Sequence, residues 1–256
     1  MNNLNSILQL PRRCLLNKKI TKAFFKRNFE LTSKEKALLD DASLITCMDW
    51  LASISPSSTN INLYSDDNFL YEEVQVITVN SESTNFEKSC FNIIELIQKY
   101  IPYPILLTVY SDKDFIMNTC DKKINRNDNS LRTIEKKYST ELINVATPTE
   151  QQKTFLNSLS FAALDKTNLK TFYDSYTQRI AALQTAMIKG SFVPRTQSRT
   201  ANDIENMERI ETLEKEITAL QNQAKKETQL SQRIEFNTQL QQKRKQIEQL
   251  KELIIL

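Results

Sequence analysis

The chain has 256 residues, of which 25% are charged and 40% are hydrophobic, and its formal net charge is +3. This composition is typical of a folded protein with one large or two small domains rather than of a disordered chain. The chain contains no histidine and one glycine, Gly190. These counts exclude histidine-activated nucleophiles and the glycine-rich loops that hold phosphates in nucleotide-binding folds. We therefore expect no cofactor, and we favour a protein that is not an enzyme.

The four cysteines stand singly along the chain and show no paired spacing. This pattern predicts reduced, mostly buried thiols and no metal site. No apolar run approaches the roughly 20 residues that span a bilayer, so we expect a cytoplasmic protein without a membrane partner. A mitochondrial transit peptide is the less favoured interpretation of the N-terminus, which is basic and poor in acidic residues.

Residues 1–30 are predicted to form a basic arm with one apolar side. The first 29 residues include seven basic residues and no acidic one, so the rest of the chain is net negative. The arm is expected to contact DNA phosphates, or else to be a solvated face or to dock on an acidic protein. We expect Phe24 and Phe25 to be core anchors rather than platforms for stacked bases. The basic residues are Arg12, Arg13, Lys18, Lys19, Lys22, Lys26 and Arg27.

Residues 31–190 predict an α/β (α+β) globular domain with a small mixed sheet and a helical second half. A first helix is expected over residues 32–54, because Thr32 and Glu35 have the spacing of a capping box and Ser55-Pro56 ends the pattern. Short β-branched or aromatic runs predict strands at residues 60–63, 73–80, 104–110 and 115–120.

A helix over residues 84–100 separates the second and third of these strands. Strand, helix and strand at this length predict a parallel crossover. The short turn after Tyr110 predicts an antiparallel hairpin with the next strand. The expected sheet therefore contains both parallel and antiparallel pairs.

The second half of this domain begins with a polar loop over residues 122–132 and a short strand at residues 141–145. Thr147-Pro148-Thr149-Glu150 then supplies a hydroxyl cap, a proline at the first helical position and a glutamate at the third. A further helix from about Lys166 is expected to end at Gly190, where a left-handed residue is favoured. Residues 191–200 predict a polar linker.

Residues 201–256 predict a coiled-coil helical hairpin. Two apolar seams are offset from each other by two residues around a polar break, which favours two helices folded back on each other. An intermolecular coiled coil, and with it self-association, is the alternative. We expect the seams to bind partners. Their residues are Ile210, Leu213, Ile217 and Leu220 in the first seam, and Phe236, Leu240, Ile247, Leu250 and Ile254 in the second.

Two further features carry alternative functions. The Ile101-Pro102-Tyr103-Pro104 turn is either a recognition surface or, as we favour, a rigid connection with Tyr103 packed underneath. Asp66, Glu73 and Asp112 stand near predicted strands, and a magnesium-dependent DNA nuclease would need such carboxylates. We prefer the simpler explanation that hairpin edges are rich in acidic residues, and predict no catalytic and no metal-binding residue.

Short motifs along nearly the whole chain resemble a bacterial family of unknown function numbered four-three-nine-one. Members of that family are commonly found beside helicases and DNA methyltransferases of restriction or phage-defence islands. The resemblance therefore implies a non-enzymatic accessory or adaptor subunit that binds a helicase or translocase and a DNA methyltransferase. The C-terminal helices would dock, and the basic arm would touch DNA. The motifs are Leu10-Pro11, Asn17-Lys18-Lys19-Ile20, Lys34-Glu35-Lys36, Ser55-Pro56, Thr59-Asn60-Ile61, Glu73-Val74-Gln75-Val76, Ile101 to Leu106, and Arg233 to Asn237.

Overall fold

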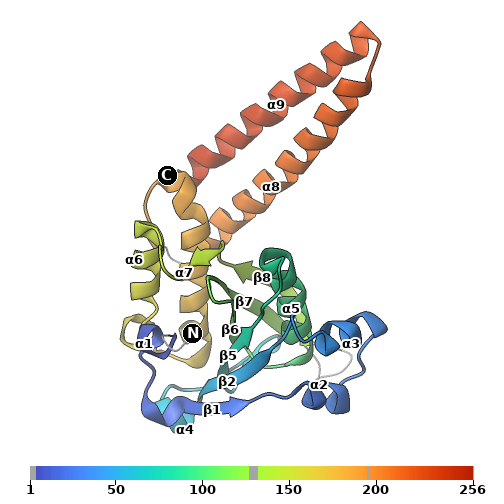
Figure 1. The fold of residues 1–256 in the computed structure, drawn as a ribbon. Coiled ribbons are helices and arrows are strands. Elements are labelled where there is room, and N and C mark those ends of the chain that lie inside the picture. Colours follow the sequence, from blue (N-terminus) through green and yellow to red (C-terminus); the bar gives the residue numbers. More distant parts are fainter. Residues whose placement is uncertain (1–3, 127–131, 195–196, 256) are drawn as a thin grey trace. The chain divides into compact units, whose positions relative to one another are not determined.

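The computed structural model describes residues 4–126, 132–194 and 197–255 (Figure 1). The chain divides into two compact units, Met1–Leu183 and Gln184–Leu256. The first unit is built on a β-sheet and the second on two long helices. Among the described residues, no helix combines the length and the apolar character needed to cross a bilayer.

Seven strands of the described chain form one mixed sheet in the first unit, in the order β1-β2-β5-β6-β7-β8, with β9 paired to β7. Strands β5 and β6 are parallel, and the other pairs are antiparallel. The expected mixed sheet, with its parallel crossover and its hairpin, is therefore confirmed. The strands are β1 (Leu15–Lys19), β2 (Cys47–Ile54), β5 (Val74–Asn80), β6 (Ile105–Tyr110), β7 (Asp114–Ile124), β8 (Arg132–Ser139) and β9 (Ile143–Asn144).

Helix α5 (Phe86–Tyr100) covers one face of this sheet (Figure 1). Its apolar residues recur at helical spacing, and Ile93 and Ile97 pack in one core cluster with Ile77 and Leu107 of the parallel strands. Burial of such side chains contributes about 1.5–3 kcal/mol each. The helix predicted over residues 84–100 is thus confirmed, although its N-cap is Asn85 rather than Thr84.

The part of helix α7 (Leu169–Lys189) that belongs to the first unit packs on the opposite face of the sheet. The Tyr173 hydroxyl donates to the carbonyl oxygen of Ile105 and accepts from the amide of Cys120, and Thr177 donates to Thr119. The smaller elements around it are α1 (Leu4–Leu8), η1 (Arg12–Cys14), α4 (Pro56–Thr59), the β3–β4 hairpin (Tyr64–Ser65 and Leu70–Tyr71), α6 (Glu150–Ser158) and η2 (Phe161–Ala163). Helix α6 starts two residues later than expected, because Thr149 rather than Thr147 caps it.

The helix predicted over residues 32–54 is wrong in its second half. Helix α3 (Ser33–Asp40) does begin with the Thr32/Glu35 capping box, but residues 47–54 form strand β2. Strand β2 pairs on both sides, with β1 and β5, and these two ladders outweigh the local helical spacing.

Two other expectations for the sheet are also corrected. The strand expected at residues 60–63 is absent from the described structure, where β3 and β4 form instead. The loop expected over residues 122–132 is shortened, because β7 runs to Ile124 and β8 starts at Arg132, while residues 127–131 lie outside the described chain. Half of the residues in strand β8 are charged (Arg132, Glu135, Lys136 and Lys137), which hid the strand from a search for apolar runs.

The segment predicted as a basic arm contributes elements to the first unit. After α1 and η1 it forms edge strand β1 and helix α2 (Lys22–Asn28). Leu4, Leu8 and Phe25 are fully or almost fully buried. Residues 1–3 of the expected arm lie outside the described chain.

The second unit contains α8 (Gln197–Lys226) and α9 (Leu230–Ile255), which fold back on each other (Figure 1). Lys243 forms an ion pair with Glu216 at 2.6 Å, and Arg199 donates to the carbonyl oxygen of Leu253. The sequence predicts a polar break at residues 225–231, and the two helices are separated at residues 227–229 within it. Gly190, with φ of +74°, ends α7 as expected. Helix α8 begins inside the expected linker. A coiled-coil geometry stays a prediction.

Candidate functional site

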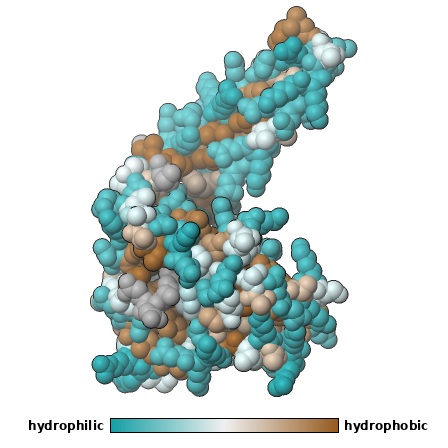
Figure 2. Space-filling model, in the orientation of Figure 1, coloured by the Kyte–Doolittle hydropathy of each residue, from teal (hydrophilic) through white to brown (hydrophobic). Residues whose placement is uncertain are grey.

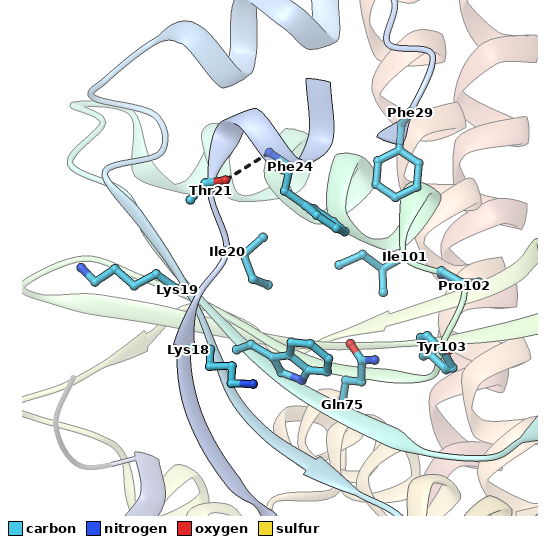
Figure 3. A pocket seen from close by; sticks show the side chains of 11 residues that line it. Lys18, Lys19, Ile20, Thr21, Phe24, Phe29, Gln75, Ile101, Pro102 and Tyr103 are labelled. Atoms are coloured by element: carbon cyan, nitrogen blue, oxygen red, sulfur yellow. Dashed lines mark hydrogen bonds between the residues drawn. The ribbon is translucent and has the colours of Figure 1, made fainter. Parts of the chain in front are cut away.

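The first unit has a pocket of about 420 Å³ where edge strand β1 meets the end of α5 (Figure 3). The N-terminal basic segment supplies one wall, and the Ile101–Tyr103 turn supplies another. We call this site the aromatic pocket. Its lining residues are Lys18, Lys19, Ile20, Thr21, Phe24, Phe29, Trp50, Gln75, Ile101, Pro102 and Tyr103.

The aromatic wall follows from the way α2 begins. The Thr21 hydroxyl accepts a hydrogen bond from the Phe24 amide at 3.1 Å, so the helix starts directly beside the pocket. Successive residues of a helix point in different directions, and Phe25 is fully buried while Phe24 is 43% exposed (Figure 3). The expectation that both are core anchors holds for Phe25 and is wrong for Phe24.

Phe29 connects this wall to the end of α5. Its ring contacts Phe24 at a centroid distance of 5.8 Å and Tyr100 at 5.0 Å. Tyr100 in turn donates its hydroxyl to Glu35 and to the carbonyl oxygen of Glu30. The aromatic wall is therefore tied to α3 as well as to α5.

Glu35 of α3 makes the hydrogen bonds that connect these elements. It accepts hydrogen bonds from Lys99 at 2.7 Å, from Tyr100 and from the Thr32 amide. Partial burial opposes ionisation of Glu35, but the hydrogen bonds outweigh it and lower the pKa of this carboxyl to about 2. Glu35 therefore remains charged at neutral pH.

The opposite wall is held by a buried lysine. Lys122 of β7 donates its ammonium to the carbonyl oxygens of Ile101 and Tyr103, at 2.7 and 2.9 Å. Burial lowers the pKa of Lys122 to about 7. Tyr103 itself is 36% exposed and lines the pocket, so the expectation that it packs under the turn is wrong.

The sheet provides a polar floor. The side chain of Gln75 is buried and projects from β5 into the pocket (Figure 3). Its amide nitrogen donates to Glu73 at 2.9 Å, and Glu73 also accepts from Ser53 at 2.6 Å. The indole nitrogen of Trp50 is buried and has no hydrogen-bond partner in the described part of the chain. A buried donor without a partner is unfavourable by about 1–3 kcal/mol.

The seven basic residues of the N-terminal segment have different surroundings. Lys18 and Lys19 lie at the edge of the aromatic pocket. Lys22 donates to the carbonyl oxygen of Asp41, and Lys26 forms an ion pair with Asp40. Arg12, Arg13 and Arg27 are exposed. Apart from Lys26, none of the seven forms an ion pair within the described residues.

The three carboxylates of the nuclease hypothesis are not brought together. Asp66 accepts hydrogen bonds inside the β3–β4 turn, and Glu73 bonds Ser53 and Gln75. Asp112 lies in the turn after β6, at the other end of the parallel strands from Glu73, about 20 Å away for a seven-residue strand. Among the described residues, no group of three cysteines or carboxylates is placed to hold a metal ion.

The predicted partner-binding seams face each other inside the second unit. Ile210, Leu213, Ile247 and Ile254 are buried in one cluster, which Ile217 and Leu250 join. Leu240 is also buried, and Leu220 and Phe236 are half-buried. These side chains are therefore occupied by contacts within the chain.

Sequence reasoning found the basic residues and the Ile101–Pro104 turn but missed Trp50, Phe29 and Gln75. Trp50 was hidden by the wrong helix over residues 32–54. Gln75 gave a usable signal, because it is a polar residue within the otherwise apolar run Val74–Ile77. A polar side chain in a buried strand needs a partner, and this one lies in a pocket.

One of the comparisons with known proteins gave a match. A family model described as a domain of unknown function, DUF4391, matches residues 8–247. No curated protein and no solved structure matches the chain significantly. The match includes the basic segment, the aromatic pocket and most of both long helices, and the chain therefore belongs to the DUF4391 family.

Proposed function

We propose that the protein is a non-enzymatic accessory subunit of a bacterial, cytoplasmic restriction or phage-defence complex. Its partners would be a helicase or translocase and a DNA methyltransferase. The choice of partners follows from the genomic neighbourhood expected for the family. The absence of histidine supports a binding role, and so does a pocket whose described lining includes no carboxylate and no thiol.

The observation that carries the proposal is an apolar patch at the turn between α8 and α9. Leu230 is 71% exposed and Ile234 is 58% exposed, although the neighbouring seam residues are packed. Figure 2 shows hydrophobic residues gathered at this turn. We call Leu230 and Ile234 the tip patch. Large apolar side chains grouped on a surface are typical of a protein-binding site.

Basic residues flank the tip patch. Lys225, Arg233 and Arg244 line a cleft of about 410 Å³ between α8 and α9, and their side chains form no ion pair within the described residues. A partner with an apolar centre and an acidic rim would complement this surface. In this proposal the tip patch replaces the seams as the docking surface, because the seams contact each other.

The proposal is tested by copurification of the tagged full-length protein with the proteins encoded beside it, among which we expect a helicase and a methyltransferase. The double variant Leu230→Lys/Ile234→Lys is expected to reduce partner recovery at least tenfold. Gln223→Lys/Gln241→Lys places the same charges on exposed positions of the same helices and should leave recovery unchanged. Full recovery with the tip variant would remove the tip patch as the docking element.

The alternative function is a magnesium-dependent DNA nuclease subunit. It would use Asp66, Glu73 and Asp112, whose separation in the structure argues against one shared metal. Incubation of the purified chain with DNA and magnesium distinguishes the two functions. Cleavage that disappears in Glu73→Gln would favour the nuclease over the accessory subunit.

A further inference from the structure

We propose that the aromatic pocket binds an unstacked base of single-stranded nucleic acid, while Lys18 and Lys19 contact the adjacent phosphates. This inference assigns a ligand to the first unit. It is independent of the docking function proposed for the tip patch.

The size and the walls of the pocket fit a base. Its volume of about 420 Å³ lies in the range of roughly 300–1,000 Å³ that is typical of small-ligand sites. Phe24, Phe29, Trp50 and Tyr103 all contribute to its lining. Aromatic side chains bind bases by stacking, and they do so with any sequence because every base has a π-face.

The polar floor separates a base from a purely aliphatic ligand. Gln75 offers a carboxamide, and the Trp50 indole offers a donor that has no partner within the described residues. The edge of a base carries both donors and acceptors. An aliphatic chain in the same place would leave the Trp50 indole nitrogen without a hydrogen bond, which is unfavourable.

The charge at the edge of the pocket favours an anionic ligand. Lys18 and Lys19 are exposed and form no ion pair with any described residue. Lys18 points toward the side of the pocket where Gln75 and Tyr103 lie, and Lys19 points away from the aromatic side chains (Figure 3). No acidic residue is among the residues that line the pocket. A nucleotide unites an aromatic body with an adjacent negative charge, and this combination matches both features of the site.

The recessed position of the pocket implies single-stranded rather than duplex nucleic acid. A base within a duplex is stacked and paired, and it enters a protein pocket only after it is flipped out, at a free-energy cost of a few kcal/mol. A single strand presents its bases without most of that cost. The proposal therefore predicts a preference for the single strand at equal length and salt concentration.

Trp50 makes the test direct, because it is the only tryptophan in the chain and it lines the pocket. The full-length protein is titrated with a mixed-sequence 12-nucleotide DNA strand and with its 12-base-pair duplex at low salt, and tryptophan fluorescence is followed. The single strand should quench the fluorescence saturably, and the duplex should bind at least tenfold more weakly.

Variants then assign the binding to the pocket. Phe24→Ala, and separately Tyr103→Ala, should weaken single-strand binding roughly 5- to 150-fold. Lys18→Gln/Lys19→Gln should make the slope of log affinity against log salt less steep by about 1.4. Lys34→Gln/Lys36→Gln, on exposed positions of α3, is the matched control and should change neither quantity. Circular dichroism establishes that each variant is folded.

Three outcomes would overturn the proposal. These are no quenching by the single strand at low salt, equal affinity for the duplex, or folded Phe24 and Tyr103 variants that bind normally. Displacement of DNA by poly-glutamate but not by mononucleotides would instead identify an acidic peptide site. The pocket variants should still copurify with protein partners, so failure of this proposal is distinguishable from failure of the tip patch.

Discussion

The aromatic pocket and the helix pair began as similar sequence patterns, since both combine an apolar stripe with basic residues. In the helix pair the stripes of α8 and α9 contact each other, and Leu213 and Ile254 are almost completely buried. In the pocket, Phe24 and Tyr103 remain substantially exposed although their neighbours are packed. An amphipathic pattern thus predicts that the apolar face of an element will be buried. It does not predict whether residues of the same chain or a ligand bury it.

The adjacent residues Phe24 and Phe25 allow a direct comparison of an exposed and a buried aromatic side chain. Phe25→Ala removes a fully buried ring and should lower the free energy of unfolding by about 3–5 kcal/mol. Phe24→Ala removes a ring that is 43% exposed and should lower it by less than about 1 kcal/mol. Urea unfolding of the two variants measures both values. Equal losses would contradict the distinction between core anchor and ligand platform.

The same comparison applies within the second unit. Leu213→Ala should lower the free energy of unfolding by about 2–4 kcal/mol, because Leu213 is 1% exposed in the contact between the helices. Leu230→Ala in the tip patch should change it by no more than about 0.5 kcal/mol. Urea unfolding followed by circular dichroism measures both values. A large loss with Leu230→Ala would mean that the tip patch is structural.

Lys122 tests how firmly the pocket wall depends on a buried amine. Its pKa of about 7 lies below the usual value of 10.5, so between pH 7 and 10 the unfolded chain binds a proton that the folded chain lacks. The contribution of this group to the free energy of unfolding therefore rises with pH in that window. The equilibrium constant for folding increases by up to about tenfold per pH unit. The wild type should gain stability relative to Lys122→Met from pH 7 to pH 10. A constant difference would show that Lys122 stays protonated.

Glu35 should give the smallest effect, in the acid range. Its pKa is lowered to about 2, so its contribution is present above the ordinary value of 4.5 and is lost as the pH falls from there toward 2. Glu35→Gln should remove this part of the acid sensitivity, at a cost of about 1 kcal/mol or less at neutral pH, because solvent screens the pair with Lys99. Thermal unfolding of both proteins between pH 2 and 6 measures the difference. If the melting temperatures of the two proteins change equally with pH, the hydrogen bonds of Glu35 do not lower its pKa.

The sequence predicted those parts of the fold that depend on interactions between residues close together in the chain. The α5 crossover, the Gly190 helix end and the break between the long helices follow from spacing, backbone freedom and polarity. Residues 47–54 and strand β8 could not be predicted in this way. Trp50 and Ile54 lie in a strand only because β1 and β5 pair on both sides of it, and β8 is as rich in charged residues as a loop.

The candidate site shows the same division. The basic segment and the Ile101–Pro104 turn were recognised in the sequence, but their meeting required β1 to join the sheet edge and Lys122 to hold the turn from below.

The mixed α/β class and the two long C-terminal helices could be predicted from the sequence, because they depend on composition and on interactions between near neighbours. Which apolar side chains are covered could be seen only in the folded chain. Phe25 and the seams are packed, while Phe24, Tyr103 and the tip patch remain accessible. The physical reason is that burial depends on contacts between residues far apart in the chain, and the spacing along one segment carries no information about them.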